Sequence, residues 1–391
     1  MKPIAMKQYT RTNVYISACI GMMFFGVSFI VMGAVLPAMS AKYGLDEVGS
    51  SLLVTFLPVG LLIGSLLFGP IVDRFGYKSL LCISSATIIG GLLGLSFLDD
   101  LNLFRIAIFF IGLGGGVLNG ATNSLVAEIY DGKQAASRLS LLGMCYGIGA
   151  LVIPLMLSFF SKRYSYETIL IWTSFVIFLS IIYFVSIKFP EPKNKQGFPI
   201  KDAIRLIKEP ALLTLGFILF FQSGLEGLLN NWSTTYLMNA SISHQDALLA
   251  LTALVLGITL GRLVLGYLIT KLNSVHILVG GLILLMAGVS VMNYADTFWL
   301  GASALLVVGL GLAGMFPIVI GAIGSMYKEM TGTAISIALF IALNGNSILN
   351  YLMGHVSARY TINFFPKFLL LCVGLQIVVI VIGRRYLNNT K

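Results

Sequence analysis

Residues 69–78 read GPIVDRFGYK, a charged segment that begins with a glycine and stands between two long apolar runs. Asp73, Arg74 and Lys78 place charges within this short segment, whereas residues 49–68 and 79–97 on either side carry none. A helix needs about 20 mostly apolar residues to cross a bilayer. The segment is therefore predicted to be a short loop that joins two membrane-spanning helices.

The rest of the chain has the same apolar character. Of its 391 residues, 58% are hydrophobic and only 10% are charged, which is typical of a membrane protein and not of a water-soluble fold. We predict an all-α integral membrane protein with twelve transmembrane helices in two pseudo-symmetric six-helix bundles. The twelve apolar runs are centred near Phe24, Gly60, Ile89, Gly114, Gly147, Ile177, Gly224, Leu256, Ile283, Gly311, Asn344 and Val373.

The residue types that soluble enzymes use are scattered in this chain. The four cysteines fall inside apolar runs with no paired spacing, and His244, His276 and His355 fall in loops or at span ends. No phosphate-binding loop of the GxxxxGK[ST] type is present. We therefore expect no catalytic site, no metal site and no cofactor, and we do not expect an enzyme.

Basic residues are distributed unevenly between the two sides of the predicted spans. Most of the 25 Lys and Arg residues fall on the side of the two termini, and basic loops are typically cytoplasmic. We therefore expect a multi-pass protein of the plasma (inner) membrane with both termini in the cytoplasm. The net charge of +10 then reflects topology and attraction to lipid headgroups, so the expected partner is the bilayer and not nucleic acid. The opposite side holds Lys42, Arg105, Lys162, Arg163, Arg359 and Lys367, and Arg262 lies in a span.

Glycines indicate an internal repeat. Gly60, Gly64 and Gly69 recur 197 positions later as Gly257, Gly261 and Gly266, and Gly112 and Gly114 recur at the same offset as Gly309 and Gly311. Shared packing chemistry alone would explain glycines in each helix, but one offset in two helix pairs favours duplication. We predict an N-terminal six-helix bundle over residues 1–188, a cytoplasmic linker over 189–210 with a surface helix at 201–208, and a C-terminal bundle over 211–391.

Two charges remain inside the predicted spans, Glu226 and Arg262, and a charge in hydrocarbon is costly and usually functional. Gln222, Glu226, Asn230 and Thr234 recur every four residues, so they share one helix face. Such a polar stripe either lines a cavity or holds helices together, and a glutamate among amides favours the cavity, because simple packing uses small residues. Arg262 lies eight residues before Thr270 at the cytoplasmic end, and a structural role is favoured because long basic side chains snorkel toward water.

The amides of the predicted spans favour a neutral hydroxylated solute, because amides both donate and accept hydrogen bonds. A dianionic substrate would instead require inward-facing cations. Trp232 and Tyr236 are candidates for stacking on the solute, although both residue types also occur at membrane interfaces for other reasons. The predicted substrate-binding residues are Asn119, Asn123, Tyr146, Gln222, Asn230, Asn231, Trp232, Tyr236, Asn344, Asn346 and Asn350.

The segment at residues 69–78 resembles the signature loop of the major facilitator superfamily, a family of solute carriers, and the likeness extends over the whole chain. The resemblance implies that Asp73 caps the helix that begins near Thr331, and that Arg74 joins Asp73 and Glu128 in a cytoplasmic latch that holds the outward-open state. The residues expected to take part in gating are Gly69, Asp73, Arg74, Gly76, Lys78, Glu128 and Arg262.

Residues 112–125 (GLGGGVLNGATNSL), residues 143–154 (GMCYGIGALVIP) and the region of Glu226 look like the fucose, glucose and galactose permease branch of that family. The resemblance implies alternating access. We expect a monomeric secondary transporter that moves a monosaccharide together with a proton carried by Glu226, where desolvation favours the neutral carboxyl. The alternatives are a proton-coupled exporter of drugs or lipids, a sodium-coupled symporter that uses Glu226 with Asn230, and a receptor that does not transport.

Overall fold

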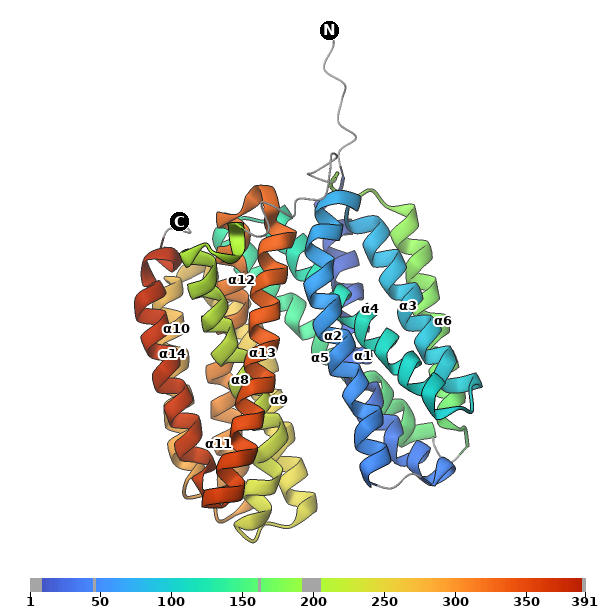
Figure 1. Ribbon diagram of the computed structural model, residues 1–391. Helices are drawn as coiled ribbons and strands as arrows, with labels where there is room; N and C mark the ends of the chain where they lie inside the picture. Colours follow the sequence, from blue (N-terminus) through green and yellow to red (C-terminus); the bar gives the residue numbers. More distant parts are fainter. Residues whose placement is uncertain (1–8, 45–46, 161–162, 192–204, 389–391) are drawn as a thin grey trace. The chain divides into compact units, whose positions relative to one another are not determined.

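The computed structural model describes residues 9–44, 47–160, 163–191 and 205–388, and these residues form helices with short connections and no strand. Among them, twelve helical segments are long and apolar enough to cross a membrane, which confirms the predicted spans. Figure 1 labels the helices. They are α1 (Arg11–Tyr43), α2 (Glu47–Phe75), α3 (Tyr77–Phe97), α4 (Leu101–Ile129), α5 (Gly132–Phe160), α6 (Tyr166–Ser186), α8 (Pro210–Asn239), α9 (His244–Lys271), α10 (Ser274–Met292), α11 (Phe298–Leu312), α12 (Met315–Met326), α13 (Thr331–Tyr360) and α14 (Phe365–Asn388), with 3-10 turns at Lys328–Met330 and Ile362–Phe364.

The loop predicted at residues 69–78 is shorter in the structure than expected. Helix α2 continues to Phe75 and α3 begins at Tyr77, so Gly76 alone separates them. Gly76 has φ 78° and ψ 167°, a backbone conformation that side-chain-bearing residues rarely adopt. The charges of this segment therefore lie on the last turns of α2 and the first turn of α3, and the glycine makes the sharp reversal.

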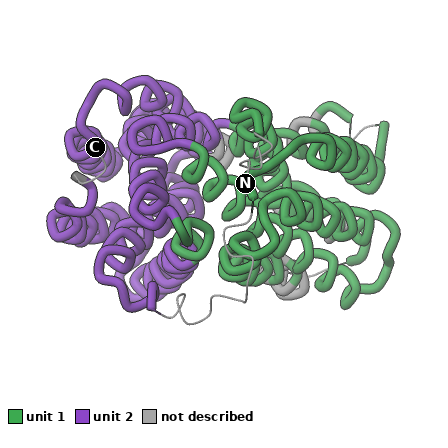
Figure 2. The backbone as a smooth tube through the Cα atoms, turned by 90° about the horizontal axis from the view of Figure 1, so that it is seen from above, with its two compact units in different colours: residues 1–129, 145–200, 329–336 green, residues 130–144, 201–328, 337–391 purple. Residues whose placement is uncertain are grey.

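The described helices group into two compact units (Figure 2). Unit 1 comprises residues 1–129, 145–200 and 329–336, and unit 2 comprises residues 130–144, 201–328 and 337–391. Helices α5 and α13 are therefore each divided between the units. Of the predicted linker, residues 192–204 lie outside the described residues, and residues 205–207 are helical.

The two units contain the same helix crossings at one sequence offset, which bears out the predicted repeat. A Cβ atom added to Gly60 would overlap the carbonyl oxygen of Phe109, and one added to Gly257 would overlap that of Leu306. Each residue of the second pair lies 197 positions after its counterpart in the first. Three further pairs of glycine contacts are related by the same offset. In each, the added Cβ would meet a backbone carbonyl oxygen: that of Leu57 for Gly112 and Leu254 for Gly309, Ser84 for Gly114 and Gly281 for Gly311, and Ala107 for Gly91 and Ala304 for Gly288.

The repeat differs at one span. Helix α4 runs without interruption in unit 1, whereas its counterpart in unit 2 is divided into α11 and α12, with Ala313 and Gly314 between them. Pro317 lies in the first turn of α12. Proline has no N–H to offer the carbonyl four residues earlier, here that of Ala313, and its ring crowds that carbonyl. Pro317 is therefore compatible with a new helix that begins at Met315.

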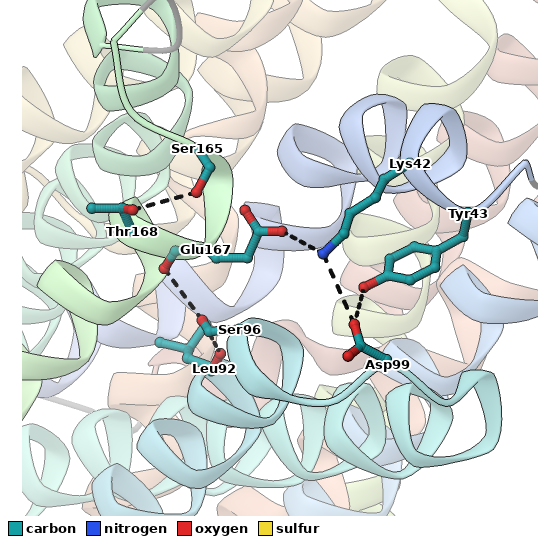
Figure 3. Close-up of polar contacts among 8 residues, drawn as sticks. All are labelled: Lys42, Tyr43, Leu92, Ser96, Asp99, Ser165, Glu167 and Thr168. Atoms are coloured by element: carbon teal, nitrogen blue, oxygen red, sulfur yellow. Dashed lines mark hydrogen bonds and ion pairs between the residues drawn. The ribbon is translucent and has the colours of Figure 1, made fainter.

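A polar cluster holds together the ends of α1, α3 and α6 in unit 1 (Figure 3). Lys42 Nζ lies 2.9 Å from Glu167 Oε1 and 4.0 Å from Asp99 Oδ1, and the Tyr43 hydroxyl donates to Asp99 at 3.0 Å. The Ser96 hydroxyl also reaches the Glu167 carbonyl at 3.3 Å. Hydrogen bonding to Tyr43 and then to Glu167 raises the pKa of Lys42, so the ammonium stays charged.

Candidate functional site

Unit 2 contains a hydrogen-bonded amide cluster between α8 and α13. The Oδ1 atom of Asn350 accepts from Asn231 Nδ2 and from Trp232 Nε1, each at 3.0 Å. The Nδ2 atom of Asn350 donates to Asn346, at 2.8 Å to the backbone carbonyl and 3.0 Å to the side-chain oxygen. Four of the predicted substrate-binding residues, Asn231, Trp232, Asn346 and Asn350, are therefore brought together, and we call them the α8–α13 cluster.

Glycines allow the two helices to come close enough for this cluster to form. A Cβ atom on Gly227 of α8 would overlap the side-chain amide of Asn346, and one on Gly345 of α13 would overlap the backbone of Phe220. Backbones can approach closely where side chains are absent. The amide of Asn346 therefore lies directly on the backbone of α8.

The cluster retains both kinds of hydrogen-bonding group. Within the described part of the chain, the amide oxygen of Asn231 accepts no hydrogen bond and the amide nitrogen of Asn346 donates none. Asn231 is exposed, and Asn346 and Trp232 are half-buried. An acceptor, a donor and an indole ring are thus available near one another, which are the groups that bind a neutral hydroxylated molecule.

Glu226 precedes Gly227 on α8 and is half-buried. As far as the described residues go, its carboxylate forms no hydrogen bond and no ion pair. Asn230, one turn later, donates its side-chain amide to the backbone carbonyl of Glu226 at 2.8 Å, not to the carboxylate. An acidic group inside a membrane span without a counter-charge is costly and usually functional, which makes Glu226 a candidate functional residue.

In three other predicted binding residues of unit 2, the side chain donates a hydrogen bond to a backbone carbonyl. Gln222 is 1% exposed and its Nε2 atom donates to Leu312 at 3.1 Å, and the buried hydroxyl of Tyr236 donates to Met292 at 3.1 Å. Asn344 donates to Phe340 of its own helix at 2.8 Å. The structure thus places Gln222 in a contact with α11 and Tyr236 in a contact with α10.

Unit 1 contains the remaining predicted binding residues. Asn123 is 1% exposed and donates to Asn119, at 2.8 Å to the carbonyl and 3.0 Å to the side-chain oxygen. Tyr146 of α5 stacks on Phe25 of α1, with ring centroids 5.2 Å apart and planes inclined at 29°. The close crossing at Gly26 and Gly149, where added Cβ atoms would overlap backbone, brings α1 and α5 together.

Among the predicted gating residues, Asp73 meets the start of α13 within unit 1. Its Oδ2 atom accepts from the Thr333 N–H at 3.1 Å and from the Thr333 hydroxyl at 2.6 Å, and both residues are buried. The carboxylate complements the positive end of the helix dipole. Asp73 therefore caps the first turn of α13, which begins at Thr331. Gly69 permits this approach, since a Cβ atom there would press on Gly332, Thr333 and Ser336.

Tyr77 is a further residue of this region, and it was not among the predicted site residues. Its buried hydroxyl donates to Glu128 Oε2 at 2.7 Å and lies 2.9 Å from the Ser124 hydroxyl. Arg74 is exposed, with its guanidinium 5.1 Å from the centre of the Phe75 ring. Lys78 donates to the carbonyls at the end of α6, those of Val185 and Ile187.

Arg262 is half-buried and lies against the start of α5 within unit 2. Its Nη1 atom donates to the Gly143 carbonyl at 3.2 Å, and the Ser140 hydroxyl donates to the Arg262 carbonyl at 2.5 Å. The Ser137 hydroxyl donates to the Gly266 carbonyl one turn further along. Small residues on α5 leave room for the guanidinium, because a Cβ atom on Gly143 would overlap it. The guanidinium of Arg262 therefore takes part in a contact between α9 and α5.

Known proteins resemble the chain over most of its length. The glucose/mannose transporter GlcP of Bacillus subtilis is 22% identical over 373 residues, which cover 90% of this chain and 91% of that protein. The cis,cis-muconate transport protein of Acinetobacter baylyi is 24% identical over 68% of each chain. A crystal structure of the fucose:proton symporter FucP of E. coli shares the fold, with a TM-score of 0.78, 17% identity, and coverage of 94% of this chain and 98% of that one.

The family model described as Major Facilitator Superfamily matches residues 18–381, which is nearly the entire chain. This match agrees with the twelve spans and with the contact between the signature segment and α13. The protein is thus a multi-pass membrane protein that belongs to the Major Facilitator Superfamily of transporters.

Proposed function

We propose that the protein is a secondary active transporter that moves a neutral hydroxylated solute, a monosaccharide, by proton symport and alternating access. The observation that carries this proposal is the position of Glu226 on α8, one residue before Gly227, on whose backbone Asn346 of the α8–α13 cluster lies. A proton-exchanging carboxyl and a set of amide and indole groups lie on adjacent turns of one helix.

The α8–α13 cluster supplies the recognition. A sugar hydroxyl donates to the amide oxygen of Asn231 and accepts from the amide nitrogen of Asn346, and the face of Trp232 covers the apolar side of the ring. Asn350 orients the cluster, because its oxygen accepts from both Asn231 and Trp232. In unit 1, Asn119, Asn123 and Tyr146 provide chemistry of the same kind.

Glu226 supplies the coupling. When it is protonated, the carboxyl is neutral, so the change of access takes place without a net charge at this position. Binding of the proton and of the sugar next to each other on α8 links the two movements. The names of the relatives, a glucose/mannose transporter and a fucose:proton symporter, support this assignment.

The muconate relative suggests a dicarboxylate as a second candidate substrate. A dianion requires a cationic side chain, and in unit 2 the spans offer Arg262, which already donates to the Gly143 carbonyl. The amide cluster carries no charge. These contacts favour the neutral solute, and the dicarboxylate serves as the discriminating comparison in the experiment below.

The remaining assignments follow from the sequence. The excess of Lys and Arg on the side of the termini supports a plasma (inner) membrane protein with both termini in the cytoplasm. The glycine repeat supports bundles over residues 1–188 and 211–391 with a linker over 189–210. We propose that this arrangement acts as a monomer.

Uptake by the purified protein in reconstituted vesicles tests the proposal. A panel of monosaccharides and cis,cis-muconate is offered with a pH gradient and a sodium gradient imposed separately. We expect one or more sugars to accumulate when the outside is acidic, with no effect of sodium and no uptake of muconate. Accumulation driven by sodium alone would overturn the proton assignment, and uptake of muconate without sugar would overturn the substrate class.

A further inference from the structure

Gln222 is the buried polar side chain of α8 that lies nearest the break between α11 and α12. Its Nε2 atom donates to the carbonyl of Leu312, the last residue of α11, at 3.1 Å. In an unbroken helix that carbonyl would accept from residue 316. The side chain of Gln222 thus takes the place of a helical hydrogen bond next to Ala313 and Gly314, where the helix is interrupted.

The contact leaves Gln222 only partly satisfied. Its Oε1 atom is buried and has no hydrogen-bond partner within the described residues. Leaving a buried acceptor unpaired is unfavourable, so packing alone gives no reason for an amide at this position. Only the Nε2 donor of the Gln222 side chain forms a hydrogen bond within the described residues, with the Leu312 carbonyl.

The internal repeat shows that Gln222 and the break occur together. The counterpart of Pro317 in the first half is Gly120, within the unbroken α4, and the counterpart of Gln222 is Phe25 of α1. Phe25 stacks on Tyr146 and offers no hydrogen-bonding group. The half with the continuous span therefore lacks the amide, and the half with the broken span has it.

Gln222 also lies one turn before Glu226 on the same face of α8. We propose that Gln222 is a positioning residue, which fixes α8 to the open end of α11 and thereby sets where Glu226 meets the solute path. It acts through the helix contact and does not touch the solute. The link to Glu226 rests on the proposed function, whereas the link to the helix break does not.

Hydrogen exchange followed by mass spectrometry tests the helix contact in the full-length protein. In Gln222→Leu, the amides of residues 313–316 and 318 should exchange about tenfold faster than in the wild type, because the end of α11 has lost its donor. The corresponding α4 segment, residues 116–121, is the internal control and should not change. Gln376→Leu is the matched variant, since Gln376 is equally buried, has an unpartnered Oε1 atom and donates to Ile218 of α8 instead of to α11.

Gln222→Glu adds a readout that a purely structural role would not produce. A protonated carboxyl can donate to the Leu312 carbonyl and a carboxylate cannot, so the exchange ratio of variant to wild type should approach one at acid pH and rise with pH. In vesicles, Gln222→Leu should lose sugar accumulation in a pH gradient and keep sugar counterflow. Equal exchange in Gln222→Leu and wild type, or equal acceleration in Gln376→Leu, would overturn the proposal. The exchange ratios decide this point whether or not a sugar is transported.

Discussion

The carboxylate of Asp73 accepts two hydrogen bonds from one residue, Thr333, through its backbone N–H at 3.1 Å and its hydroxyl at 2.6 Å. The two residues are 260 positions apart in the chain, and both side chains are buried. A carboxylate at the start of a helix is favoured by the helix dipole. This contact joins the signature segment to the first turn of α13 within unit 1.

Replacing Asp73 by Asn should weaken this contact. The neutral amide still accepts one hydrogen bond, but it loses the charge that strengthens both bonds, so the free energy of unfolding should fall by about 1–3 kcal/mol. Unfolding in mixed micelles measures the change. Thr333→Val keeps the N–H bond and removes the hydroxyl bond, so it should cost less than Asp73→Asn. Equal stability of Asp73→Asn and wild type would show that the contact contributes nothing.

Tyr77→Phe should also destabilise the protein. The hydroxyl that donates to Glu128 at 2.7 Å is buried, and its loss leaves the carboxylate with one donor fewer. The expected cost is about 1–3 kcal/mol. Tyr294→Phe is the control, because Tyr294 is 75% exposed. An identical response of the two variants in the same unfolding measurement would contradict the role given to Tyr77.

Asn350→Ala should impair recognition of the solute. The variant removes the oxygen that orients both Asn231 and Trp232, and the loss of such a bond corresponds to roughly a tenfold higher KM for sugar uptake. Initial rates of uptake in vesicles measure the effect. Ser347→Ala on the same helix is the control, since Ser347 is exposed and donates to its own backbone at Leu343. An unchanged KM in Asn350→Ala would exclude the cluster from binding.

Replacing either of two repeated glycines by alanine should destabilise the protein, because both halves contain an equivalent close helix crossing. Gly60→Ala and Gly257→Ala each drive a methyl group into a carbonyl oxygen of a neighbouring helix, and overpacking of this kind costs about 1–3 kcal/mol. Gly280→Ala is the control, because no atom lies within 4 Å of the added Cβ. Unfolding measurements should separate the first two variants from the third, and a similar stability of all three would refute the shared crossing.

The spans and the repeat could be predicted because they depend on local properties of the chain. Apolar length determines which segments can cross a membrane, and the glycines at one offset mark crossings where backbones touch. The structure shows equivalent helix contacts at Gly60 and at Gly257, and likewise at Gly112 and at Gly309.

The partners of individual side chains could not be predicted in this way. Helical spacing correctly places Gln222, Glu226 and Asn230 on one face, yet Gln222 is 1% exposed and Asn230 is exposed. Periodicity does not say which neighbouring helix covers each turn. Tyr77 was overlooked for the same reason, since its partner Glu128 is 51 residues away. The partner of Arg262 could not be predicted either, because Gly143, which leaves space for the guanidinium, lies 119 residues away.

The central claim is that Glu226 couples a proton to the movement of a neutral sugar, and Glu226→Gln in reconstituted vesicles tests it most directly. The amide keeps the size of the side chain and cannot release a proton. We predict that the variant no longer accumulates sugar in a pH gradient but still exchanges labelled for unlabelled sugar across the membrane. Accumulation at the wild-type level in Glu226→Gln would contradict the claim.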